Sequence, residues 1–195
     1  MINTKKAIII HGWDGNPDKG WFRWLKKELE KRKFKVIAPK MPNPAAPKLK
    51  AWLKKMESTA KDIDEDTIFI GHSVGCQTIL RFLEKSSVKK VGGIIFVAGW
   101  LKLKEFAYKE NPEYENEVRK IAKPWITTKI DFSKTKRKAS FITYIISDDD
   151  PYVSPENAKI FRSKLGAKII KQHGKGHFAE LKTQKIPIIL KEIPR

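Results

Sequence analysis

The residues of this chain best suited to chemistry are a serine between two glycines and the acids and histidines that follow it. Gly71, Ser73 and Gly75 fit the pattern G-x-S-x-G within the stretch TIFIGHSVGCQTIL. A serine hydroxyl becomes a strong nucleophile only when a base takes its proton and an acid orients that base. The later segments ISDDDPYV (146–153) and HGKGHF (173–178) supply both groups in the order Ser, Asp, His. This order is one in which such triads occur, and it predicts nucleophilic catalysis.

Four histidines compete for the role of the base. His72 adjoins Ser73 in the chain, so its side chain should leave the turn in another direction, and His11 is expected to shape a loop. His177 ends a glycine-spaced loop and is free to reach the serine, whereas His173 stands closer to the preceding run of apolar residues. We therefore predict His177 as the base and keep His173 as the alternative. Two intervening glycines argue against a metal site on this pair, and no metal or cofactor is expected.

Three consecutive aspartates, Asp148, Asp149 and Asp150, are the candidates for the acid. One or two of them are expected to belong to a solvated turn. Asp150 precedes Pro151, which favours an extended or turn geometry at that position. The residues alone leave the choice among the three open.

The elements that must position these groups follow from the pattern of apolar residues. Short β-branched runs alternate with amphipathic segments, which is typical of a parallel sheet covered by helices on both faces. We predict strands within 5–12, 34–39, 67–71, 91–99, 140–147 and 167–172, and helices at 21–33, 48–63, 74–87, 154–166 and 178–193. The predicted fold is an α/β fold, a three-layer α/β/α sandwich with a mainly parallel sheet.

In this fold Ser73 stands in a tight turn between a strand and the helix that follows it. Glycines at 71 and 75 would let the strand and the helix pass closely without a clash of Cβ atoms. The turn would hold the serine above the carboxyl ends of the strands, where open α/β sheets bind ligands.

Residues 101–139 interrupt the alternation of strands and helices. This excursion contains charged helical stretches and two prolines, and an insertion of this length is often functional. We predict one domain over residues 1–195, with 101–139 as a lid or cap. Trp100 and Trp125 border the excursion and are predicted to line a substrate pocket.

Composition limits the class of protein. The 195 residues carry a net charge of +19, from 41 Lys and Arg against 22 Asp and Glu. Lysine is spread through every segment, so a solvated lysine coat is favoured over a nucleic-acid site. The single cysteine, Cys76, allows no intrachain disulfide and is interpreted as a buried apolar residue. No signal peptide or membrane span is apparent, and a cytoplasmic protein is expected.

Several motifs together resemble a known family. The segments GHSVG, HGWDG, SDDDPYV and GHF are similar to those of the α/β-hydrolase superfamily. Within it, GWFRWLKKEL and PWITTKIDF resemble the small serine hydrolases of the retinoblastoma-binding protein 9 type. The resemblance extends over nearly the whole chain, from about residue 7 to about residue 180.

The resemblance implies roles for individual residues. It implies Ser73 as nucleophile, His177 as base and Asp150 as acid, because the family's acid begins an Asp-x-x-Val step. Here Ser154 separates that valine from the proline that often follows it directly, so Asp149 stays an alternative acid.

An oxyanion hole is also expected. The backbone N–H of Val74, directly after the nucleophile, is one expected donor. By its resemblance to the family's HGW segment, the backbone N–H of Trp13 is the other.

The predicted function is that of a serine hydrolase. It would cleave a carboxylic ester, with amide hydrolysis as the second choice, through an acyl-enzyme. The expected partner is an uncharged or anionic small-molecule acyl substrate, with no membrane partner. The alternative is a non-catalytic binding module on the same fold, whose basic surface binds nucleic acid or a protein.

Overall fold

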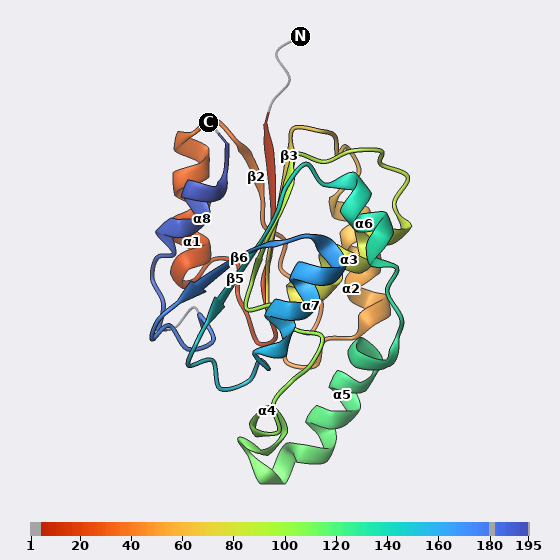
Figure 1. The fold of residues 1–195 in the computed structure, drawn as a ribbon, viewed down its shortest axis with the longest axis vertical. Coiled ribbons are helices and arrows are strands. Elements are labelled where there is room, and N and C mark those ends of the chain that lie inside the picture. The colour runs from red at the N-terminus through yellow and green to blue at the C-terminus, as the bar shows by residue number, and fades with distance from the viewer. Residues whose placement is uncertain (1–4, 180–181, 195) are drawn as a thin grey trace.

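The computed structural model describes residues 5–179 and 182–194, and its centre is a six-stranded sheet (Figure 1). The strands are β1 (Lys6–Ile10), β2 (Lys35–Ile37), β3 (Thr67–His72), β4 (Gly93–Val97), β5 (Ile142–Ser147) and β6 (Lys168–Gln172). Their order in the sheet is β2-β1-β3-β4-β5-β6, and every neighbouring pair is parallel. The predicted α/β fold is confirmed.

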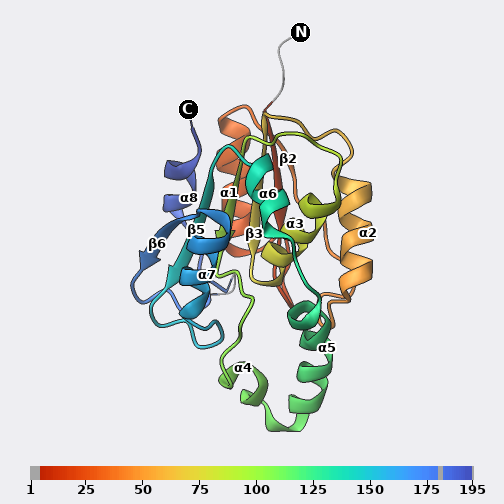
Figure 2. The same cartoon turned by 45° about the vertical axis from the view of Figure 1, so that its right-hand side comes forward.

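Helices cover both faces of this sheet. One face is covered by α1 (Gly20–Lys31) and α8 (Pro187–Glu192), as Figures 1 and 2 show. The other face carries α2 (Leu49–Thr59), α3 (Val74–Lys85) and α7 (Glu156–Leu165), and α6 (Phe132–Lys138) packs against α3 and α7. The sheet is therefore the middle of three layers, as the alternation of strands and helices predicts.

The alternation of side chains along each strand divides the core into two parts. Along β1, Ile8 and Ile10 face the same core as Trp52 of α2. Ala7 and Ile9 point to the opposite face and pack in the core that contains Trp21 of α1. Both faces of the strand are buried, which explains why β1 reads as a continuous apolar run rather than an alternating one.

The chain reverses its direction of winding beside β1. Strand β2 lies on one side of β1 and β3 on the other, so the loops after β1 and β3 diverge at the carboxyl edge of the sheet. This topological switch point is where open α/β sheets form a ligand crevice. It is also where the sequence places Ser73, directly after β3.

The last predicted helix is wrong in its extent. The sequence predicts helix over 178–193, whereas α8 contains only Pro187–Glu192. Residues 178–179 and 182–186 are not helical, and 180–181 lie outside the described residues. Pro187 stands in the first turn of α8, where the missing N–H is not needed, so proline begins this helix rather than interrupting a longer one.

The excursion at 101–139 is largely helical, as expected. It contains α4 (Phe106–Lys109), the 3₁₀ helix η1 (Pro112–Tyr114), α5 (Glu115–Thr127) and α6. In Figure 1, α4 and α5 lie beyond the carboxyl ends of the strands. Arg81 of α3 anchors the end of α5, because its guanidinium donates to the carbonyls of Trp125 (2.7 Å) and Thr128 (2.9 Å). The lid function, like the single-domain assignment, stays a prediction.

The contact between α3 and β1 gives a direct test of the packing at the turn. A Cβ atom on Gly75 would lie 2.4 Å from the carbonyl oxygen of Ile10 and 2.6 Å from that of His11. We expect Gly75→Ala to lower the free energy of unfolding by about 1–3 kcal/mol, because backbone atoms must move to admit the methyl group. Lys85→Ala, at an exposed position of the same helix, should change it by at most about 0.5 kcal/mol. Urea denaturation of both variants measures the difference, and an equal effect would contradict this account.

Candidate active site

The turn between β3 and α3 holds Ser73 in a backbone conformation that few L-residues adopt. Its φ is 52° and its ψ is −123°. The Ser73 N–H donates to the carbonyl of Val97 on β4 at 3.0 Å, and its carbonyl accepts from Cys76 N–H at 3.1 Å. These bonds, and the close passage of Gly75 past β1, keep the strained residue in place. The tight turn expected from the sequence is present.

Two hydrogen bonds connect Ser73, His177 and Asp150. The Ser73 Oγ atom lies 3.0 Å from His177 Nε2, and His177 Nδ1 lies 2.8 Å from Asp150 Oδ2. The Asp150 side chain is 2% exposed, and its other oxygen accepts from the N–H groups of Tyr152 (2.9 Å) and Val153 (3.0 Å). The backbone of its own turn therefore holds the Asp150 carboxylate in the orientation in which it bonds to His177.

The other two aspartates make different contacts. Asp148 accepts a hydrogen bond from the exposed His173, which lowers the pKa of Asp148. Asp149 accepts from the hydroxyl of Ser147 and from the N–H of Gly176, and the bond to Ser147 lowers the pKa of Asp149. The structure therefore brings Asp150 and His177 to the serine, and it keeps Asp149 and His173 in the supporting loops.

Trp100 makes a second hydrogen bond to the serine hydroxyl. Its indole Nε1 donates to Ser73 Oγ at 3.2 Å. Because this bond uses the oxygen as an acceptor, the hydroxyl proton is left for His177 Nε2. The neutral tautomer of His177 then carries its proton on Nδ1 and donates it to Asp150. The direct bond to the nucleophile was not predicted, although the position of Trp100 just after β4, beside β3, was a signal for it.

His11 supports the loop that follows β1. The Met41 N–H can only donate, so His11 Nε2 accepts from it at 2.9 Å. The proton on Nδ1 is then donated to the carbonyl of Gly12 at 2.8 Å. The expectation that His11 shapes a loop is confirmed.

His72 points away from the serine hydroxyl to the other side of the turn, as expected. Its Nε2 lies 2.8 Å from the carbonyl oxygen of His177, so this nitrogen carries the proton. Burial, together with the nearby His177 ring, lowers the pKa of His72 to about 3. The imidazole is therefore neutral, and this tautomer persists at ordinary pH.

The loop after β1 lies against the turn that carries Ser73. A Cβ atom on Gly12 would lie 2.9 Å from the Cβ of Ser73, so the loop that leads into Trp13 packs against the nucleophile turn. Among the described residues, neither the N–H of Trp13 nor that of Val74 donates to another protein group. Within the described part of the chain, neither N–H group is thus committed to a protein acceptor.

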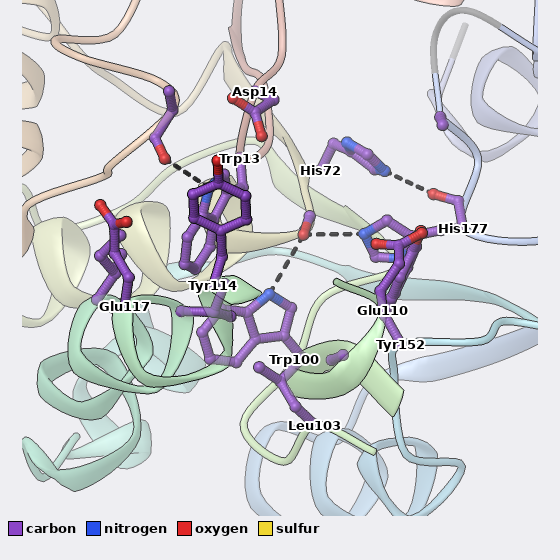
Figure 3. A pocket seen from close by; sticks show the side chains of 16 residues that line it. Trp13, Asp14, His72, Trp100, Leu103, Glu110, Tyr114, Glu117, Tyr152 and His177 are labelled. Atoms are coloured by element: carbon purple, nitrogen blue, oxygen red, sulfur yellow. Dashed lines mark hydrogen bonds between the residues drawn. The ribbon is translucent and has the colours of Figure 1, made fainter. Parts of the chain in front are cut away.

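A cavity of about 440 Å³ opens at the serine. Figure 3 shows Trp13 and Tyr114 on one side of it and His177 and Tyr152 on the other. The excursion contributes seven lining residues: Leu103, Ala107, Glu110, Tyr114, Glu117, Val118 and Ile121. A cavity of this size and lining suits a small ligand.

The two tryptophans predicted to line a pocket differ in their positions. Trp100 lines the cavity. The prediction for Trp125 is wrong: its ring is fully buried against Trp52, its indole donates to the carbonyl of Pro47, and it is not among the cavity-lining residues. Its apolar ring joins the core beneath the excursion rather than the site.

Other reactive groups in the described chain do not form a site. Burial raises the pKa of Cys76, and its thiol donates to the carbonyl of Val97, which fits the buried structural cysteine that was expected. Among residues 5–179 and 182–194, no three acidic, histidine or cysteine residues are grouped so as to bind a metal ion. No helix in the same residues is long and apolar enough to span a membrane.

Comparison with known proteins decides the family. The model of a family described as serine hydrolase matches residues 7–189, which is most of the chain. The chain belongs to the serine hydrolase family. Within this family, the chain is 32% identical to the Bacillus subtilis protein YdeN over 179 residues, which are 91% of this chain and 87% of that protein.

One further relative and one solved structure extend this comparison. The chain is 29% identical to the serine hydrolase RBBP9 of Rattus norvegicus over 198 residues, covering 99% of this chain and 97% of that one. The crystal structure of the YdeN protein matches with a TM-score of 0.84 at 30% identity over 96% of both chains. The family resemblance noted in the sequence is thus confirmed, and so is its fold.

Proposed function

We propose that this serine hydrolase cleaves small carboxylic esters with Ser73 as nucleophile, His177 as base and Asp150 as the acid that orients the base. The observation that carries this proposal is the continuous hydrogen-bonded chain from Asp150 through His177 to Ser73, which ends at a cavity. Membership of the family supports the same chemistry.

The reaction proceeds in two halves. His177 Nε2 takes the hydroxyl proton while Ser73 Oγ attacks the carbonyl carbon of the ester. The imidazolium then gives this proton to the leaving alcohol as the C–O bond breaks, which leaves the acyl group on Ser73. Water, activated by the same histidine, attacks the acyl-enzyme and releases the acid. Asp150 holds the proton of His177 on Nδ1 throughout.

The backbone N–H groups of Trp13 and Val74 bind the negative oxygen of the tetrahedral intermediate. The absence of an acceptor for them in residues 5–179 and 182–194 supports this role. The donors are held by the turn after β3 and by the loop that His11 fixes, so they need not reorganise as charge develops. An oxyanion-hole donor of this kind contributes about 10²–10³ in rate.

The charged residues that line the cavity narrow the class of substrate that we propose. Lysine and arginine make up 41 of 195 residues, yet none of those in the described part of the chain lines the cavity. Among the described residues, the carboxylates that line it are those of Asp14, Glu110 and Glu117. The lining disagrees with the expectation of an anionic substrate, because like charges repel. We propose a neutral or cationic ester as the substrate.

Hydrolysis of a neutral p-nitrophenyl ester tests the proposed activity. We expect Ser73→Ala to reduce kcat by about 10⁴ or more, because the acyl-enzyme can no longer form. His177→Gln should cause a similar loss, and the double variant should lose little more. Initial rates on folded proteins of equal concentration provide the measurement. Wild-type protein without Ser73-dependent turnover would contradict the proposal and favour the binding-module alternative.

The choice of acid has a matched test in the adjacent aspartate. We expect Asp150→Asn to lower kcat by about 10⁴, since an amide cannot keep His177 in the required tautomer. Asp149→Asn keeps the shape of a side chain that accepts hydrogen bonds from Ser147 and Gly176, and it should lower kcat by less than about tenfold. If Asp149→Asn shows the large loss, the assignment is wrong.

Esters of equal size but different charge test the substrate proposal. We expect kcat/KM to rank cationic or neutral acyl chains above an anionic one. Glu117→Gln should reduce the ratio of kcat/KM between the cationic and the anionic ester by about two- to fivefold, which is the range for an exposed charge pair. Glu113→Gln removes the same charge from an exposed position that does not line the cavity, and it should leave the ranking unchanged. Equal effects of the two variants on the ranking would show that the net charge of the protein, and not the lining of the cavity, sets the preference, and this would contradict the substrate proposal.

A further inference from the structure

The loop that carries His177 needs support from outside itself. Three residues in it have left-handed backbone conformations, with φ of 65° at Gly174, 53° at Gly176 and 54° at Phe178. The segment lies between β6 and α8 and contains no helix or strand among its described residues. Its shape therefore depends on hydrogen bonds to other elements.

Two buried rings supply such bonds at consecutive residues. His72 Nε2–H donates to the carbonyl of His177 at 2.8 Å, and Trp21 Nε1–H donates to the carbonyl of Phe178 at 2.9 Å. His72 is 3% exposed and Trp21 is fully buried. Hydrogen bonds in such a site are shielded from competition with water.

The two donors are themselves fixed by packing. The rings of Trp21 and His72 meet edge to face at 5.8 Å between centroids, and Phe22 contacts His72 at 5.9 Å. Trp21 belongs to α1, and His72 is the last residue of β3, directly before the nucleophile. A Cβ atom on Gly12 would lie 2.8 Å from His72 Nδ1, so the imidazole fills a closely bounded space.

From this geometry we propose that His72 and Trp21 are positioning residues, which set the distance between His177 and Ser73 by holding the carbonyls of residues 177 and 178. His72 and Ser73 are consecutive residues. Ser73 is the nucleophile, and His72 holds the loop that carries the base. This inference rests on the proposed role of His177.

The expected consequence is a loss of turnover rather than of binding. His72 and Trp21 contact the main chain of the loop that carries His177. Substituting either of them leaves the side chains of His177 and Ser73 in the protein. If the support is removed, His177 Nε2 is less often within hydrogen-bond distance of Ser73 Oγ, and misplacement of this order lowers kcat strongly. The KM of a neutral ester should change little when Trp21 is substituted, because Trp21 is not among the residues that line the cavity.

Trp21→Phe is the central variant, since it keeps an aromatic ring and removes the indole donor together with part of the ring volume. Trp52→Phe is the matched control: Trp52 is also fully buried, and its indole donates to the carbonyl of a loop residue, Pro42, at 2.8 Å. We expect Trp21→Phe to lower kcat about tenfold with KM unchanged, and Trp52→Phe to leave both parameters within about twofold. Thermal denaturation checks that the two variants are folded and lose similar stability.

A second pair of variants tests His72. Glutamine carries an amide that can donate a hydrogen bond, whereas leucine cannot. We expect His72→Gln to retain several times the kcat of His72→Leu, and kcat is the parameter to compare because His72 also lines the cavity. This pair also carries the test if Trp21→Phe does not fold.

Amide hydrogen exchange separates this inference from the proposed function. The amides of residues 173–179 should exchange faster in Trp21→Phe than in the wild type, and Trp52→Phe should leave them unchanged. Equal kcat and equal exchange in the two tryptophan variants would overturn the positioning role. A wild-type protein without Ser73-dependent hydrolysis would instead refute the proposed function, while the exchange measurement would still report whether the two rings hold the loop.

Discussion

The left-handed conformation of Ser73 is the constraint on which the rest of the structure depends. A residue at φ 52° between a strand and a helix is unfavourable by itself, at a cost of about 1–3 kcal/mol. It persists because the neighbouring strands hold it: the Ser73 N–H is bonded to β4, and Gly75 lies against the carbonyls at the end of β1. The turn directs the Ser73 hydroxyl toward His177 and Trp100, and it places the His72 ring at the edge of the cavity, against Trp21 and Phe22.

Loops after four parallel strands meet around this turn. The loop after β1 brings Trp13, the loop after β4 brings Trp100, and the loops after β5 and β6 bring Asp150 and His177. The three adjacent aspartates after β5 all contact the segment that carries His177. Asp148 and Asp149 bond to the glycine-spaced loop after β6, and Asp150 bonds to the ring of His177. The position of the histidine is thus determined by contacts spread over several elements.

The sequence predicted the parts of this arrangement that have local causes. The order of strands and helices follows from short apolar runs, and the position of Ser73 follows from glycines that only a tight turn requires. Residues 177 and 150 could be ranked above their neighbours by spacing and family resemblance. The sequence missed effects that depend on tertiary distance: the bond from Trp100 to Ser73, the burial of Trp125 and the acidic lining of the cavity in a chain of net charge +19. The end of the chain was also misjudged, because Pro187 can begin a helix as well as interrupt one.

The most direct test of the central claim is to locate a covalent adduct on the protein. An alkyl fluorophosphonate reacts with a serine only when a neighbouring base activates it and an oxyanion hole binds the phosphoryl oxygen. After reaction under mild conditions, intact-mass and peptide mass spectrometry should show one adduct per chain, located on Ser73, and His177→Gln should suppress it. An adduct on another residue, or no adduct on folded wild-type protein, would contradict the assignment of Ser73 as the nucleophile.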